Sequence, residues 1–326
     1  MTKSEWIPAS AGMTVSRTAL ARAITLIEST REDHQKEAQA LLAEVLPKTG
    51  KSIRIGITGA PGVGKSTFIE AFGLHVIEKG HKVAVLAIDP SSSITGGSIL
   101  GDKTRMAKLA QNENAYIRPS PASGSLGGVA RRTREAMLLC EAAGYDVIIV
   151  ETVGVGQSET EVADMVDMFV LLLLPGSGDE LQGIKKGIVE LADLIIVNKA
   201  DGDLKAQARR VRSDYAGALK ILRTAGEHWQ PKVVTCSALY GEGMDAIWKT
   251  VREFSGIMRK NGHMENRRAH QAAAWMWKEI RETLLSRFMH HPGITAHIQE
   301  TEKSVLKGTC PPGLAAAKLI RIFLDE

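Results

Sequence analysis

At 326 residues the chain is longer than an average domain, but single α/β domains often exceed 200 residues, so one large domain with helical additions is expected. Apolar residues make up 44% and charged residues 24%, values that exclude a disordered chain and a disulfide-stapled scaffold. The net charge of +4 is spread along the chain and is too weak to indicate nucleic acid binding.

The three cysteines, Cys140, Cys236 and Cys310, are far apart and form no CxxC pair. This usage fits a reducing compartment and does not favour a structural zinc site. No stretch approaches the roughly 20 apolar residues that span a bilayer, and no apolar run of signal-peptide length opens the chain. We therefore expect a cytoplasmic protein with neither nucleic acid nor membrane among its partners.

The N-terminal part of the chain divides into two segments. Residues 1–16 show no apolar period and are expected to be disordered. Residues 17–50 are predicted to form a helical extension. Their apolar residues recur with helical spacing at Leu20, Ile24, Ile27, Leu41, Leu42 and Val45.

Residues 51–258 alternate short β-branched runs with helical stretches. Six runs have the composition of buried strands: IRIGIT, KVAVLAID, DVIIVET, MFVLLLL, DLIIVNK and KVVTCSA. Strands that are apolar on both faces are typical of a sheet that helices cover on both sides. The pattern predicts an α/β fold with a doubly wound, mostly parallel sheet.

Residues 259–326 carry no strand signal and are predicted to form three helices. Pro292 and Pro311-Pro312-Gly313 mark the breaks between them. One apolar stripe follows the first helix at Ala273, Trp277, Ile280, Leu284 and Phe288. Aromatic residues such as Trp275 and Trp277 fit either packing within the chain or a dimer contact.

A glycine-rich motif lies between the strand IRIGIT and the helical stretch STFIEAF. It consists of Gly59, Ala60, Pro61, Gly62, Val63, Gly64, Lys65 and Ser66, followed by Thr67, and matches G-x-x-x-x-G-K-[ST] in full. In such a P-loop the backbone N–H groups surround phosphates, Lys65 binds the β- and γ-phosphate oxygens, and Ser66 holds magnesium. The motif predicts a nucleoside triphosphate site of the P-loop NTPase type.

A second motif predicts that the base is guanine. Asn198, Lys199 and Asp201 follow the strand LIIV, at the sheet edge where nucleotides bind. The Asp201 carboxylate can accept hydrogen bonds from guanine N1–H and N2–H, donors that adenine lacks. Lys199 is expected to pack along the base and Asn198 to brace the loop. The remaining guanine loop is expected at Ser237, Ala238 and Leu239. GTP and GDP are the predicted ligands.

Three further carboxylates are expected near the phosphates. Asp89 and Glu151 each end a predicted strand, and Asp102 lies in the loop DPSSSITGGSILGDKTRM. Such carboxylates are linked to magnesium in P-loop enzymes. The predicted magnesium set is Ser66, Asp89, Asp102 and Glu151, and the predicted catalytic set is Lys65, Asp89, Asp102 and Glu151.

Two stretches have the composition of nucleotide switches. The Gly154 N–H is placed to bond the γ-phosphate and to release it on hydrolysis. Val155 occupies the position at which Ras-like proteins carry a water-positioning glutamine, which predicts slow intrinsic turnover. Gln157 is a nearby substitute for that glutamine. A further flexible element is expected at residues 176–187.

Taken together, the strings GAPGVGKST, AIDPSSSITGGSILGDKTRM, ETVGVGQSE, LPGSGDELQGIKKGI and NKAD, in this order, resemble one family. It is the methylmalonyl-CoA mutase-associated GTPases of the MeaB or ArgK type, in the metal-chaperone branch of P-loop GTPases. The resemblance covers residues 17–326, whereas residues 1–12 match nothing in it.

The resemblance implies a homodimeric GTPase that loads and protects an adenosylcobalamin-dependent acyl-CoA mutase without itself holding cobalamin. It assigns the phosphate, magnesium and guanine residues as above, and makes residues 176–187 a switch that signals to the mutase. It also makes residues 259–326 a dimerisation arm. Two alternatives stay open: a GTP-dependent kinase linked to lysine, arginine and ornithine transport, and a nickel-insertion GTPase. Scattered histidines disfavour the second.

Overall fold

The computed structural model describes residues 16–88, 106–119, 126–152, 158–176, 186–222 and 228–324. The chain divides into two compact units, Met1–Glu265 and Asn266–Glu326. Of the stretch predicted to be disordered, only Ser16 is among the described residues, and its side chain caps the first helix by accepting a hydrogen bond from Ala19 N.

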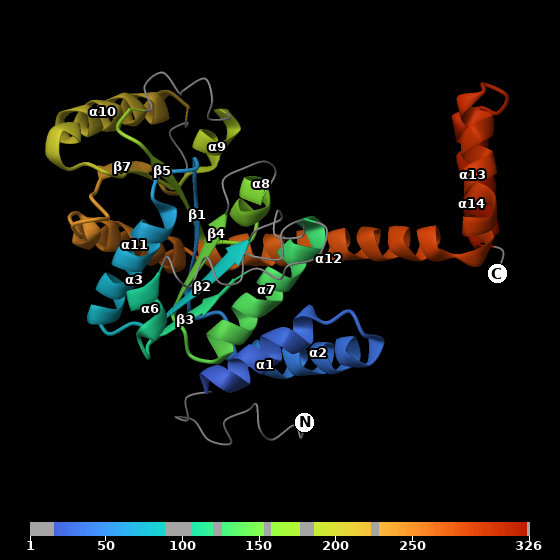
Figure 1. Cartoon of the computed structure of the whole chain (residues 1–326), viewed down its shortest axis with the longest axis horizontal. Helices are drawn as coiled ribbons and strands as arrows, with labels where there is room; N and C mark the ends of the chain where they lie inside the picture. Colours follow the sequence, from blue (N-terminus) through green and yellow to red (C-terminus); the bar gives the residue numbers. More distant parts are fainter. Residues whose placement is uncertain are drawn as a thin grey trace. The chain divides into compact units, whose positions relative to one another are not determined.

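The first unit is built on a parallel sheet of seven strands in the order β3-β2-β4-β1-β5-β6-β7. The strands are β1 (Ile53–Gly59), β2 (Val83–Ile88), β3 (Ala115–Arg118), β4 (Val147–Thr152), β5 (Met168–Leu173), β6 (Leu194–Val197) and β7 (Lys232–Thr235). Because β2, β3 and β4 lie on one side of β1 and β5, β6 and β7 lie on the other, the predicted doubly wound fold is confirmed (Figure 1).

The six predicted strands are all present, but strand β3 was not predicted. It is only four residues long, pairs with β2 and has the sequence AYIR. So short a segment with a charged end carries too little apolar periodicity to be distinguished from a loop.

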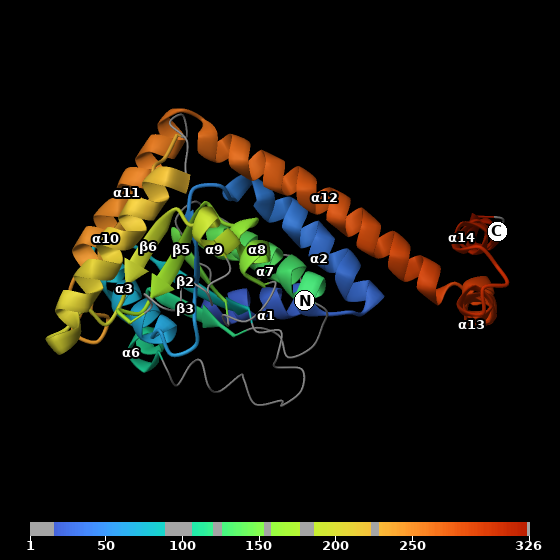
Figure 2. The same cartoon turned by 90° about the horizontal axis from the view of Figure 1, so that it is seen from above.

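Helices cover both faces of the sheet (Figures 1 and 2). One face packs against α3 (Lys65–Glu78) and α11 (Met244–Lys260), with α6 (Ala107–Gln111) beside α3. The other face is covered by α7 (Leu126–Ala142), α8 (Ser158–Ala163), α9 (Lys186–Leu191) and α10 (Lys205–Leu222). Short 3₁₀ turns lie at Leu46–Lys48 and Gly202–Leu204.

Alternate residues of the strands face opposite layers of helices. Ile57 and Val170 lie in one core with Phe72 of α3, whereas Leu171 lies in a second core with Tyr215 of α10. Both faces of these strands are buried, which is why their sequences read as continuous apolar runs. Each such side chain contributes roughly 1.5–3 kcal/mol through burial.

The N-terminal extension contains α1 (Arg17–Glu28) and α2 (Glu32–Val45), both packed against α7. The predicted apolar residues Leu20, Ile24 and Ile27 of α1 are buried. Glu28 also forms an ion pair with Arg118 at the end of β3. The extension is therefore fixed to the sheet's outer layer and to its edge strand.

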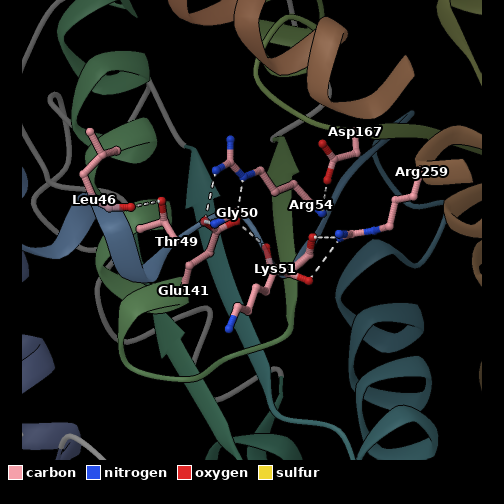
Figure 3. A network of polar contacts seen from close by, with 9 residues as sticks. Leu46, Thr49, Gly50, Lys51, Arg54, Glu141, Asp167 and Arg259 are labelled. Atoms are coloured by element: carbon pink, nitrogen blue, oxygen red, sulfur yellow. Dashed lines mark hydrogen bonds and ion pairs between the residues drawn. The ribbon is translucent and has the colours of Figure 1, made fainter. Parts of the chain in front are cut away.

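A buried polar network holds the start of β1 (Figure 3). The Arg54 side chain donates two hydrogen bonds to Glu141 of α7, at 2.9 and 3.1 Å. The backbone N–H of Arg54 donates to the Asp167 carboxylate at 2.8 Å. Glu141 also accepts a hydrogen bond from Gly50 N at 2.8 Å. Arg259 of α11 donates to the carbonyls of residues 51 and 52. Strand β1 is thus tied to helices from both faces of the sheet.

The second unit is helical. It contains most of α12 (His263–His290), then α13 (Pro292–Leu306) and α14 (Pro312–Leu324), which confirms the three helices and both proline breaks predicted for this region. Helices α13 and α14 pack together. The rings of Phe288 and Phe323 meet edge to face, with their centroids 5.4 Å apart. None of the helices in the described part of the chain is both long and apolar enough to cross a bilayer.

Candidate nucleotide site

The phosphate-binding loop joins β1 to α3 at the carboxyl edge of the sheet. A Cβ atom on Gly59 would lie 2.6 Å from the Leu172 carbonyl oxygen, so no larger residue fits there. Gly62 and Gly64 have φ angles of 81° and 90°, in the left-handed region that glycine adopts without strain. These glycines turn the chain so that α3 begins at Lys65 with its first N–H groups unpaired and available to an anion.

The Lys65 ammonium lies inside this loop. Its Nζ donates to the carbonyl oxygens of Gly59 at 2.7 Å and Ala60 at 3.4 Å. Burial lowers the pKa of Lys65, while the negative charges of Glu151 and Glu159 act in the opposite direction. The ammonium group can exchange these carbonyl partners for phosphate oxygens when a nucleotide binds.

Ser66 and Glu151 meet at the end of β4. The Ser66 hydroxyl lies 3.3 Å from Glu151 Oε1, and Glu151 is buried. In the register of the sheet Glu151 is opposite Ile57, two residues before the loop begins. Hydroxyl and carboxylate oxygens are the donors that magnesium prefers, so these two predicted ligands fit that ion.

Asn198 connects the two halves of the site. Its Nδ2 donates to the Val63 carbonyl at 2.9 Å, and its Oδ1 accepts from Ala238 N at 3.0 Å and from the Cys236 thiol at 3.4 Å. The side chain is almost fully buried. The phosphate-binding loop and the loop at residues 236–239 are therefore fixed to each other by one amide group.

The other predicted guanine residues lie around this bridge. Lys199 has a positive φ of 55°, and its Nζ donates to the Gly62 carbonyl at 2.9 Å. Asp201 accepts a hydrogen bond from the Ser237 hydroxyl, and Leu239 is 73% exposed. The structure thus brings all the described members of the predicted phosphate and guanine sets together at one edge of the sheet.

Three predicted site residues, Asp89, Asp102 and Gly154, lie outside the described residues, as do Val155 and Gln157. The neighbouring strand ends are described: Ile88, the last residue of β2, is opposite Thr152, the last residue of β4. Most of the predicted switch at 176–187 also falls outside the described residues. The roles of these residues stay predictions.

Sequence reasoning missed Glu159. This residue of α8 is buried, and its charge acts on Lys65. The only sequence signal is an acidic residue five positions after Gly154, and acidic residues are common in the first turn of a helix. Its burial against the sheet could not be read from the sequence.

Comparison with known proteins adds an independent finding. The family model described as "Methylmalonyl Co-A mutase-associated GTPase MeaB" matches residues 20–293. The Mus musculus protein "Methylmalonic aciduria type A homolog, mitochondrial" is 53% identical over 317 residues, which cover 94% of this chain and 76% of that protein. "GTPase ArgK" of Escherichia coli is 51% identical over 296 residues, covering 91% of this chain and 89% of that one.

A solved structure is also similar. The protein described as "LAO/AO transport system kinase" superimposes with a TM-score of 0.76 at 42% sequence identity, over 94% of this chain and 93% of that chain. The similarity extends well beyond the P-loop and covers nearly the whole length of both proteins.

Proposed function

Since the chain belongs to the family of methylmalonyl-CoA mutase-associated GTPases, we propose that it acts as a chaperone of an adenosylcobalamin-dependent methylmalonyl-CoA mutase or a related acyl-CoA mutase. In this role it gates cofactor loading and protects or reactivates the mutase. That the chain is a P-loop GTPase follows from the family and its named relatives. The observation that carries the mechanism is the Asn198 bridge, which makes the phosphate loop and the guanine loop one site.

Phosphate binding is the first step of the proposed mechanism. Main-chain N–H groups of the loop and the first turn of α3 donate to the phosphates, and Lys65 turns from its carbonyl partners to the β- and γ-phosphate oxygens. Ser66 and Glu151 would hold magnesium, which when bound would supply positive charge to the phosphates. The same residues then stabilise the charge that develops as the γ-phosphate leaves.

Base recognition is assigned to Asp201. Its carboxylate is held by the Ser237 hydroxyl, and it accepts hydrogen bonds from guanine N1–H and N2–H. Adenine offers no such donors, so in its complex the partly buried Asp201 carboxylate would lose both hydrogen bonds to the base. GTP and GDP are therefore favoured over adenine nucleotides.

The link to a mutase rests on the family and on the sequence of the switch region. Val155 cannot orient a water molecule, so the chain alone is expected to turn over GTP slowly. A partner that completes the site would couple its own state to hydrolysis. We propose that the partner is the mutase and that the chaperone acts as a homodimer in the cytoplasm.

Turnover with and without a mutase tests this proposal. We expect a purified adenosylcobalamin-dependent methylmalonyl-CoA mutase to raise the GTP hydrolysis rate about tenfold or more, and to be retained differently by the GDP and GTP-analogue complexes. Lys65→Ala is the control that should abolish hydrolysis in both cases without unfolding the chain.

Two results would count against the proposal. Equal turnover with and without the mutase would remove its main support. Transfer of labelled phosphate from GTP to a binding protein for lysine, arginine or ornithine would instead favour a transport-linked kinase, the function for which the similar solved structure is named.

A further inference from the structure

Helix α10 carries a stripe of positive charge at one edge of the sheet, where it packs against the last strand, β7 (Figure 1). Lys205, Arg209 and Arg212 are spaced four and three residues apart, and Lys220 follows eight residues later. This spacing places all four on one side of the helix, and all four are exposed. The single acidic residue of α10, Asp214, lies on another side. The stripe is therefore basic along its whole length.

A small hairpin lies at the start of this stripe. The Glu242 carboxylate lies 3.5 Å from Lys205 Nζ, and two backbone hydrogen bonds between Ser237 and Glu242, at 3.0 and 3.1 Å, close the hairpin. Tyr240 near its tip is 67% exposed. Leu204, directly before α10, is 41% exposed. Two exposed apolar residues, one of them aromatic, thus stand where the basic stripe begins.

Both apolar residues are attached to the loop that is assigned to base recognition. The Leu204 N–H donates to the Asp201 carbonyl at 3.0 Å. In the hairpin of Tyr240, the Ser237 hydroxyl donates to the Asp201 carboxylate. A protein bound to this surface would contact both segments that position Asp201. Its binding would therefore be linked to nucleotide binding, and the linkage would act in both directions.

We propose that the surface formed by Leu204, Lys205, Arg209, Arg212 and Tyr240, called the α10 surface, docks an acidic surface of the mutase. Tyrosine and arginine are enriched among the residues that contribute most to protein interfaces. The positive charge beside the apolar residues selects a partner whose matching surface is negative. This inference rests on the proposed function, which names the mutase as partner, and it adds where the mutase binds and by which contacts.

Binding of purified methylmalonyl-CoA mutase to the full chain, loaded with a non-hydrolysable GTP analogue, tests the inference. Arg209→Glu places a negative charge against the acidic partner and should weaken mutase binding about tenfold at low salt. Tyr240→Ser removes the aromatic contact and should also weaken it about tenfold. Added salt should weaken the wild-type complex more than the Arg209→Glu complex, because only the wild type loses an attraction. Calorimetric titration measures each affinity.

Arg210 provides the matched control. It is exposed and follows Arg209 directly, but consecutive residues of a helix point about 100° apart. Arg210→Glu changes the charge of the same helix by the same amount and should bind the mutase as the wild type does. All three variants should bind GTP as tightly as the wild type, because none of the three residues belongs to the nucleotide site.

Several outcomes would overturn the inference. Unchanged mutase binding by either Arg209→Glu or Tyr240→Ser contradicts it, and the proposed function would stand as long as the wild type binds the mutase. An equal loss in Arg210→Glu would show an effect of net charge rather than of this surface. Weaker GTP binding by Tyr240→Ser would show that Tyr240 acts on the nucleotide instead. A wild type that binds no mutase would defeat the proposed function and the α10 surface together.

Discussion

At the scale of single residues, Asn198 shows how one side chain can organise a binding site. Its amide provides one donor and one acceptor group, and both are used inside the protein. Val63 and Ala238, the residues that it joins, belong to different loops. Nucleotide binding and local stability are therefore expected to depend on the same side chain.

Asn198→Ala should lower the free energy of unfolding by about 1–3 kcal/mol, because the Val63 carbonyl and the Ala238 N–H lose their partner in a buried region. It should also weaken GTP binding, since the two loops are no longer fixed to each other. Denaturant unfolding and nucleotide titration measure the two effects. Asn198→Asp is the comparison. Its carboxylate keeps an acceptor for the Ala238 N–H, so the loop at 236–239 should be less destabilised than in the alanine variant.

The site residues that could be predicted from the sequence are those that belong to a local motif. The spacing of Gly59, Gly64 and Lys65 predicts a phosphate-binding loop. In the structure Gly64 has a positive φ and Gly59 leaves no room for a Cβ atom, as such a loop requires. Glu159 and the Arg54–Glu141 pair could not be predicted, because their importance comes from burial against residues distant in the chain. Local patterns contain no information about such contacts.

At the scale of secondary structure elements, β1 is the strand on which the site depends. Its last residue, Gly59, opens the phosphate loop, and its first residues are held by the network around Arg54 and Glu141. Burial alone would raise the pKa of Glu141, but the hydrogen bond and charge of Arg54, with Ser52 and Gly50 N–H, hold it below its ordinary value.

Glu141→Gln should therefore destabilise the protein at neutral pH, by about 3–5 kcal/mol, since it leaves the buried Arg54 without a counter-charge. Because the folded-state pKa of Glu141 is lowered, its contribution is present above the ordinary carboxyl pKa and is lost as the pH falls through the folded value. The difference between variant and wild type should shrink as the pH falls below about 4.5.

Chemical denaturation of both proteins between neutral and acid pH measures this difference. Glu32→Gln is the control, because Glu32 is exposed and pairs with Lys36 only on the surface. A Glu141→Gln variant whose deficit stayed constant over the whole pH range would contradict the assignment.

At the scale of the whole molecule, the second unit presents a broad apolar surface on α12. Trp277 and Leu285 are 57% and 62% exposed, and Leu284 and Met289 are exposed as well. Large apolar side chains at helical spacing on one solvent-facing helix are typical of an interface. This surface is the part of the second unit that we assign to the contact of the proposed homodimer.

Leu285→Asp is expected to shift the proposed homodimer to monomer by placing a charge in its interface, while GTP binding is retained because the site lies in the first unit. Light scattering after size-exclusion chromatography measures the mass. Ser286→Asp adds a charge at the next exposed position without replacing an apolar side chain, and this variant should remain dimeric. If Leu285→Asp kept the mass of the wild type, this surface would not be the dimer contact.

The Asn198 bridge also bears on the order in which the protein becomes functional during synthesis. Val63 and Asn198 are 135 positions apart, and Ala238 follows 40 positions later. A nascent chain on the ribosome carries its phosphate loop long before the segment that completes guanine selection has emerged. Until then the phosphate loop lacks both the amide that holds it in place and the side chain that selects the base.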